Sequence, residues 1–211
     1  MNDLLMAWRN IWRNPRRSIL TILAIAFATA LLVFMLSFQF GAYNDMIDSS
    51  VRLSTGHVQI VPPGYHQRPE MRKVIDNPEE LVQAATILNN VDEVSKRSEA
   101  FVLASGEKRS RGLMVNGVAP AHEAQISSVP QQIVKGRYLA QGDGAAGVIG
   151  ALAAQHLQLG IGDECVLLGS GRDGSIAAAV VEIVGIFRSG VDEFDRSTMQ
   201  LPLAEFDTIF S

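Results

Sequence analysis

The longest apolar segment of the sequence lies near its N-terminus, where residues 18–44 contain no charged side chain. A helix over Ile19–Phe40 would be apolar on every side, and at ~1.5 Å per residue it would span ~33 Å, close to the ~30 Å hydrocarbon core of a bilayer. A signal peptide has a shorter apolar core and a small-residue cleavage site, and a helix of a soluble protein is rarely apolar all round. We therefore predict a transmembrane helix over residues 18–44.

The segment before this helix has its own periodicity. Its apolar side chains fall at i, i+4, i+7 and i+8, which is the spacing of one helix face: Leu4, Trp8, Ile11 and Trp12. Asn14-Pro15 ends this helix, because proline disfavours helical backbone at the residue before it. Tryptophan favours the headgroup boundary and arginine reaches lipid phosphates. We predict an amphipathic, cytoplasmic interfacial helix over residues 1–17, with these membrane-interface residues: Trp8, Arg9, Trp12, Arg13, Arg16 and Arg17. Whether the two tryptophans only anchor in lipid or also contact a cytoplasmic partner stays open.

The charges that flank the apolar segment predict its orientation. Four arginines precede it against one acid, Asp3, whereas Asp45 and Asp48 follow it. Lys and Arg close to a span stay on the cytoplasmic side. The N-terminus is therefore expected on the cytoplasmic side of a bacterial inner (plasma) membrane. Residues 45–211 are expected outside that membrane, which is the periplasm in a diderm bacterium.

Apolar runs beyond residue 45 predict a mixed α/β domain. The helix pattern continues to about residue 54 as a stalk, and further helices are predicted after the Asn77-Pro78 cap, over 120–126 and over 148–159. Val58–Ile60 alternates as a strand would, and further strands are predicted over 98–105, 111–118, 132–139, 164–168 and 175–187. In the helix after Pro78, the predicted apolar face is Leu81, Ala84, Ala85 and Leu88.

Charge and cysteine content limit which partners and which covalent bonds the chain can have. The chain has a formal net charge of −4, although its first 18 residues are basic. The exported part is thus acidic and has no basic stripe, which argues against nucleic acid as a partner. Cys165 is the one cysteine and forms no internal disulfide. We interpret it as a small buried hydrophobe in a strand.

The sequence has only weak matches to catalytic, cofactor-binding or metal-binding motifs. The sequence GSGRDG (169–174) has the spacing G-x-G-x-x-G, but a β-branched run rather than a helix follows it, so we interpret it as a hairpin tip. His57 and His66 lack the neighbouring ligands of a metal site. The acids of VDEFD (191–195) could bind a cation weakly, but a solvated loop is the favoured interpretation. We therefore predict no catalytic residue, no cofactor and no metal.

Several segments together resemble a known family. The N-terminal NIWRNPRRSILTILAIAFA is similar to the start of ABC-transporter permeases of the MacB/FtsX type. STGHVQIVPPGY and GLMVNGVAPAHEAQISSVPQQIVKGRYL resemble the external part of the lipoprotein-releasing LolC/LolE branch. VIGALAAQHLQLGIGDECVLL and VEIVGIFRSGVDEFDRSTMQLPLAEFDTIF resemble its closing part. The resemblance follows the family's order along nearly the whole chain.

The resemblance implies an α+β architecture. One N-terminal transmembrane helix with its amphipathic pre-helix would precede a mixed α/β periplasmic domain, a MacB-like periplasmic core of one or two subdomains, over residues 45–211. Members of the family have four membrane helices, and this sequence has one apolar run of that length. We therefore expect the N-terminal part of such a subunit, a truncated gene product or a single-span relative.

The resemblance also implies partners and a function. These partners are a cytoplasmic ABC ATPase, a second permease subunit in a homo- or heterodimer, the lipid bilayer and a periplasmic lipoprotein carrier. ATP hydrolysis by the ATPase would then drive lipoprotein release toward the outer membrane. Export of drugs or peptides by the same mechanism is an alternative. A single-pass anchored binding module without transport, or an anchored enzyme with a convergent polar pocket, are further alternatives.

Overall fold

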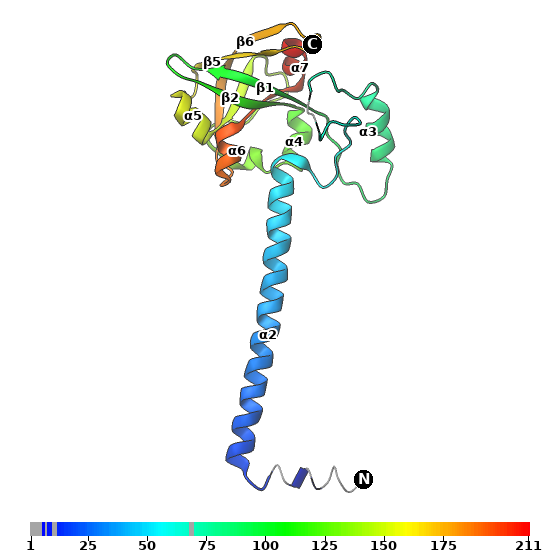
Figure 1. The fold of residues 1–211 in the computed structure, drawn as a ribbon, viewed down its shortest axis with the longest axis vertical. Helices are drawn as coiled ribbons and strands as arrows, with labels where there is room; N and C mark the ends of the chain where they lie inside the picture. Colours follow the sequence, from blue (N-terminus) through cyan, green and yellow to red (C-terminus); the bar gives the residue numbers. More distant parts are fainter. Residues whose placement is uncertain (1–5, 7, 10–11, 68–69) are drawn as a thin grey trace. The chain divides into compact units, whose positions relative to one another are not determined.

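A long helix dominates the first of two units into which the chain divides, Met1–Ser50 and Val51–Ser211. The computed structural model describes residues 6, 8–9, 12–67 and 70–211 (Figure 1). Helix α2 (Pro15–Ser50) has 36 residues, or ~54 Å at the usual rise. Pro15 opens it, where a missing N–H costs nothing. Among the described residues, this is the one helix long and apolar enough to cross a membrane.

The surface of α2 fits an apolar surrounding. Large side chains such as Leu20, Phe27 and Phe38 are exposed within this chain. The hydroxyls of Thr21 and Thr29 donate to backbone carbonyls one turn earlier, at 2.9 and 2.8 Å. Both threonine hydroxyls therefore have a hydrogen-bond acceptor within the helix and need none from solvent.

The predicted helix before Pro15 falls partly outside the described residues, and Leu4 and Ile11 of its apolar stripe are among those outside. Met6, Trp8 and Arg9 are helical, and Trp12 and Arg13 lie in a turn. The chain therefore turns just before Pro15, where the sequence predicts a break.

The second unit begins with a single π-helical turn, η1 (Val51–Thr55). Gly56 ends it with a φ of +67°, and its amide donates to the Val51 carbonyl at 2.9 Å. The predicted stalk is thus helical, although its last turn is wider than an α-helix. Such π-helical turns are rare in proteins, and those that do occur often lie at functional sites.

Six strands close into a barrel. They are β1 (Arg97–Ser105), β2 (Ser110–Val118), β4 (Ala146–Gly150), β5 (Glu164–Ser170), β6 (Ile176–Phe187) and β7 (Thr198–Pro202). Their order is β5-β1-β2-β7-β4-β6, and β6 pairs back onto β5. The pairs β2–β7 and β4–β6 are parallel, and the other pairs are antiparallel. A short strand, β3 (Ile133–Gly136), adds to the end of β6. The α+β prediction is confirmed.

The barrel interior is filled by alternate residues of its strands. Val102, Leu113, Leu167 and Met199 are fully buried there. Helix α7 (Leu203–Phe210) adds two aromatic rings to the same cluster, and α5 (Ala151–Leu157) adds small residues and a leucine. The Phe206 side chain can pack against β2 only because residue 117 is glycine. A Cβ atom at Gly117 would lie 2.6 Å from the Phe206 side chain.

A second apolar cluster covers part of the outer surface of the barrel. It comprises Val118, Val129, Leu139, Ala146, Val148 and Phe187. The segments that supply or flank it are α4 (Pro120–Ile126), η2 (Val129–Gln132) and α6 (Asp192–Ser197). Several strands are therefore buried on both faces.

This two-sided burial explains an incorrect prediction. Residues 148–150 are not the start of a helix but the end of β4, whose five residues are all buried between β6 and β7. A short apolar run of this kind cannot be assigned by periodicity alone. The helix that follows, α5, is shorter than predicted.

Two further predictions need correction. Val58–Ile60 is not a strand: both side chains are exposed and no strand of the described chain pairs with them. Helix α3 (Pro78–Thr86) begins at Pro78 as predicted, but none of its residues is buried, and Leu81 and Leu88 face solvent. Its apolar face therefore contributes nothing to the core.

We expect Gly150→Ala to destabilise the barrel. Its Cβ would overlap the backbone carbonyl of Asp195 in α6, and overpacking of a core costs roughly 1–3 kcal/mol. Gly144→Ala is the matched control, since its Cβ would meet no atom within 4 Å. Thermal unfolding followed by circular dichroism should show a lower Tm for Gly150→Ala alone. Equal melting of the two variants would contradict the close packing of α6 on β4.

Candidate functional site

Polar side chains gather where the second cluster covers the outer face of the barrel. Arg97 of β1, Asn116 of β2 and Gln200 of β7 alternate with inward-facing core residues, so they point outward. Glu123 of α4 and Tyr138, just after β3, approach them from the covering layer. We call this the polar cluster: Arg97, Asn116, Glu123, Tyr138 and Gln200.

A buried ion pair is the strongest contact of the polar cluster. Arg97 donates from Nε to Glu123 Oε2 at 3.0 Å and from Nη2 to Oε1 at 2.7 Å. The Glu123 side chain is fully buried and that of Arg97 is 16% exposed. Two-pronged, charge-assisted bonds of this kind fix both distance and orientation. They hold α4 against the start of β1.

Tyr138 forms the second contact of the cluster. Its hydroxyl donates to Gln200 Oε1 at 2.8 Å. Burial, with the nearby charge of Glu123, raises the pKa of Tyr138 well above its usual value. The phenol therefore stays neutral and acts as a donor. Gln200 is itself the cross-strand neighbour of Asn116, so the Tyr138–Gln200 bond, which joins the segment after β3 to β7, lies beside Asn116 of β2.

Two further bonds connect this region to the chain that follows α2. The Ser128 amide, between α4 and η2, donates to the Arg52 carbonyl of η1 at 3.2 Å. The Tyr65 hydroxyl donates to Glu99 Oε2 of β1 at 3.0 Å. Burial and the Glu99 carboxylate raise the pKa of Tyr65 to about 12. Within the second unit, η1 is therefore linked to the segment just after α4, and α4 is ion-paired to the barrel wall.

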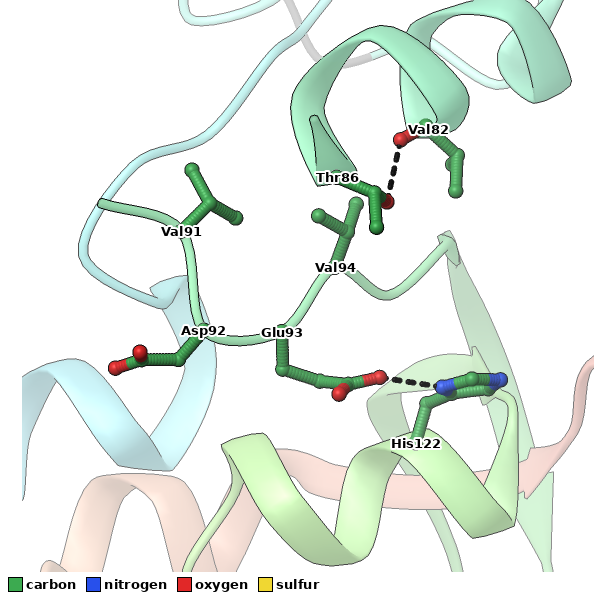
Figure 2. Close-up of a pocket in the computed structure, with 7 residues that line it drawn as sticks. All are labelled: Val82, Thr86, Val91, Asp92, Glu93, Val94 and His122. Atoms are coloured by element: carbon green, nitrogen blue, oxygen red, sulfur yellow. Dashed lines mark hydrogen bonds and ion pairs between the residues drawn. The ribbon is translucent and has the colours of Figure 1, made fainter. Parts of the chain in front are cut away.

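A small pocket opens between α3, α4 and the segment that follows α3 (Figure 2). Its volume is about 150 Å³, and it is lined by Val82, Thr86, Val91, Asp92, Glu93, Val94 and His122. Glu93 and His122 point toward each other, with 2.6 Å between Oε1 and Nδ1. Pockets for drug-sized ligands measure roughly 300–1,000 Å³. We therefore interpret this space as a gap beside α3, where the Glu93–His122 pair joins the segment after α3 to α4.

The weak metal candidates do not come together. No group of three or more His, Cys, Asp or Glu side chains that could hold a metal occurs in the part of the chain that the structure describes. His57 and His66 are exposed. Asp195 lies in α6 rather than a solvated loop, and it is buried. Its Oδ1 accepts hydrogen bonds from the amide and the hydroxyl of Ser189, at 2.8 and 2.7 Å, and these bonds offset the cost of burying the carboxylate. Its role is to hold the turn before α6.

The remaining motifs are structural. GSGRDG is the turn of the β5–β6 hairpin, as predicted: the Gly171 amide donates to the Ser175 carbonyl at 2.8 Å, and Gly174 has a φ of +88°. Cys165 is fully buried in β5, as predicted, and burial raises the pKa of its thiol to about 11.

The predicted membrane-interface residues all belong to the first unit and are all exposed: Trp8, Arg9, Trp12, Arg13, Arg16 and Arg17. The rings of Trp8 and Trp12 meet edge to face with 6.3 Å between centroids. Arg16 and Arg17 lie in the first turn of α2. Their contact with lipid stays a prediction.

Sequence reasoning missed the polar cluster. Its members are spread from residue 97 to residue 200 and share no local spacing. One signal was available: Glu123 occurs in a seven-residue helix between two strands, where burial would require a cationic partner.

Comparison with known proteins gives a family and a distant structural likeness. Residues 18–210 match the family model described as "MacB-like periplasmic core domain". No curated protein matches the chain significantly. Among solved structures, the extracellular domain of the noncanonic ABC-type transporter YknZ from Gram-positive bacteria is 19% identical, with a TM-score of 0.48. That match covers 63% of this chain and 65% of the other, so the chain spans less than two thirds of that solved domain.

Removing the carboxylate of the buried ion pair should destabilise the second unit. Glu123→Ala removes the carboxylate that accepts both bonds from the largely buried Arg97 guanidinium, and breaking a buried pair costs roughly 3–5 kcal/mol. Glu79→Ala is the control, because Glu79 forms an exposed pair with Lys96, and exposed pairs contribute little. Urea unfolding should separate the two variants. If both unfold like the wild type, α4 is not held by this pair.

The Tyr65–Glu99 contact should make stability fall at alkaline pH. In the folded chain the pKa of Tyr65 rises from 10.0 to about 12, so the folded chain keeps a proton that the unfolded chain loses in this window. The contribution is complete below pH 10 and disappears as pH rises toward 12. Tyr65→Phe should reduce the pH dependence of the unfolding free energy over this window. An unchanged dependence would show that the hydroxyl is solvated instead.

Proposed function

The chain belongs to the family of MacB-like periplasmic core domains, and from this premise we propose that it is the N-terminal part of an ABC-transporter permease subunit. The family is a non-catalytic part of transporter permeases. The observation that carries the proposal is the direct succession of a long apolar helix, α2, and the six-stranded barrel of this family. Such a chain acts by transmitting movement rather than by chemistry.

The proposed placement follows from charge and length. Residues 18–44 span the membrane, residues 1–17 lie in the cytoplasm and residues 45–211 in the periplasm. Support comes from the arginines before the span, the acids Asp45 and Asp48 after it, and the uncharged stretch between them. Trp8, Arg9, Trp12, Arg13, Arg16 and Arg17 then lie at the inner surface, where indole rings and guanidinium groups find headgroups.

The proposed partners are a cytoplasmic ABC ATPase and a second permease subunit. ATP-driven movement reaches the second unit through η1, because the chain is continuous there. From η1 it passes through the Arg52–Ser128 bond to the segment just after α4, and from α4 to β1 through the Glu123–Arg97 pair. A rigid path of this kind suits a lever, since buried ion pairs hold geometry tightly.

The proposed cargo is a lipoprotein released toward the outer membrane, with a periplasmic lipoprotein carrier as acceptor. The support is the resemblance of residues 54–65 and 112–139 to the lipoprotein-releasing branch. Other cargo, such as drugs or peptides, would use the same lever with a different periplasmic partner.

Co-purification tests the function. The full-length gene product should be extracted from its native membrane in mild detergent and isolated through a tag. We expect a cytoplasmic ATPase in the complex, with ATPase activity that depends on the permease. A full-length product that is membrane-embedded but brings no ATPase would overturn the proposal and favour an anchored binding module.

Charge substitution tests the membrane span. Leu32→Arg places a cation at the middle of the proposed span and should cost ~2.5–3.5 kcal/mol of insertion. Ile87→Arg is the matched control, because Ile87 is exposed in the second unit. The fraction of chain that resists carbonate extraction should fall for Leu32→Arg only. Equal insertion of both variants would contradict the spanning role of α2.

A further inference from the structure

The backbone carbonyl of Arg52 lies between two competing donors. In an α-helix an amide donates to the carbonyl four residues earlier, and in a π-helix to the carbonyl five residues earlier. The Gly56 amide takes the π partner, because it donates to the Val51 carbonyl at 2.9 Å. Its α partner, the Arg52 carbonyl, instead accepts from the Ser128 amide at 3.2 Å. The wide turn of η1 thus frees the carbonyl that the segment after α4 binds.

The two possible hydrogen bonds of this carbonyl are alternatives. In an α-helix a carbonyl points along the axis toward the amide four residues later. A bond from a separate segment, such as that of Ser128, needs the carbonyl tilted outward, which the wider π turn permits. α-Helical spacing in η1 would therefore join Gly56 to Arg52 and release the Ser128 amide.

The bond from Ser128 can be exchanged at little cost. Its distance is at the long end of the range for N–H···O bonds, and Ser128 is half-buried, so water can take the place of its acceptor. The Gly56 amide is bonded in both arrangements. Leu53, at 8% exposure, and the left-handed Gly56, at a φ of +67°, favour the π arrangement in the resting chain. A moderate force along the chain can therefore shift the balance.

A return of η1 to α-helical spacing would move the chain that enters it. A shift of one residue in register turns a helix by ~100° about its axis and moves it ~1.5 Å along that axis. Helix movements of this size are typical of switching transitions. Because Ser50 of α2 is followed directly by Val51 of η1, the change is passed to α2 through the backbone.

We propose that η1 is a two-position switch at the start of the second unit. In the π position the Arg52 carbonyl holds Ser128, and in the α position it holds Gly56 and the segment after α4 is released. The Arg97–Glu123 pair keeps α4 on the barrel in both positions. The switch deepens the proposed function by naming the step that converts helix movement into a change of the second unit, and to that extent it rests on it.

Ser128→Pro removes the competing donor with little other change. Proline has no amide hydrogen, requires a φ near −65° and favours extended backbone at the residue before it. Ser128 has a φ of −82°, and Ser127 has a ψ of 148°, so proline fits this backbone. Ser128→Ala is the matched control, because it removes the same hydroxyl and keeps the amide.

Spin-label distances in the full-length gene product, reconstituted in lipid nanodiscs, report the position of the switch. One label is placed in α2 at Met46→Cys or Ile47→Cys, which are exposed and ~100° apart around the helix. The second is placed at Val134→Cys, exposed in β3, and buried Cys165 should stay unlabelled.

We expect Ser128→Pro, but not Ser128→Ala, to shift the distance by several ångströms for at least one of the two α2 labels. Distances that are the same in both variants at both labels would overturn the proposal.

A second variant reaches the α position without changing Ser128. Gly56→Ala penalises the left-handed backbone alone, because its Cβ would meet only the Val58 carbonyl, at 3.8 Å. Gly64→Ala is the matched control, with a φ of +75° and a nearest atom, Gln67 Oε1, at 3.4 Å. We expect Gly56→Ala alone to move the labels as Ser128→Pro does and to speed hydrogen exchange at the Ser128 amide. Equal exchange at Ser128 in the two glycine variants would contradict the competition for the carbonyl.

The label distances separate the switch from the transporter role, because they need no ATPase. If Ser128→Pro moves the labels but no ATPase co-purifies, the switch stands and the proposed function fails. If the ATPase co-purifies and the labels do not move, the switch is wrong and the proposed function stands.

Discussion

Closure of the barrel through β6 is the constraint on which the second unit depends. Buried backbone groups need partners, and a strand of 12 residues is long enough to pair with β5 along its first half and with β4 and β3 along its end. This closure separates an inner face, filled by apolar side chains, from an outer face. The outer face of β1, β2 and β7 is then available for α4 and the polar cluster, where the Arg97–Glu123 pair holds the covering layer in one position.

The elements that sequence alone predicted have strong local signals. An uncharged run such as residues 18–44 has few alternatives to a lone helix, and α2 extends through it. The hairpins β1–β2 and β5–β6 were predicted because apolar runs flank short polar turns with glycine. Pro78 and Pro120 marked the starts of α3 and α4 because proline fits the first helical turn.

What sequence did not predict depends on distant partners. Residues 148–150 became a strand because β6 and β7 lie on either side of them, and Val58–Ile60 did not because no strand is beside it. The polar cluster is of the same kind, because Glu123 can be buried only where Arg97, 26 residues earlier in the chain, reaches it. Nothing in the local spacing of either residue indicates that meeting. Asp195 likewise is buried only because the turn at Ser189 supplies donors.

Cys165, enclosed in β5, has a consequence for how the chain matures. Disulfide cross-linking contributes nothing to the stability of this barrel, since its single thiol, that of Cys165, is buried among apolar neighbours. Strand pairing, core packing and the buried Arg97–Glu123 pair therefore hold the fold. The folded conformation of residues 51–211 should therefore be indifferent to the thiol–disulfide balance of its surroundings.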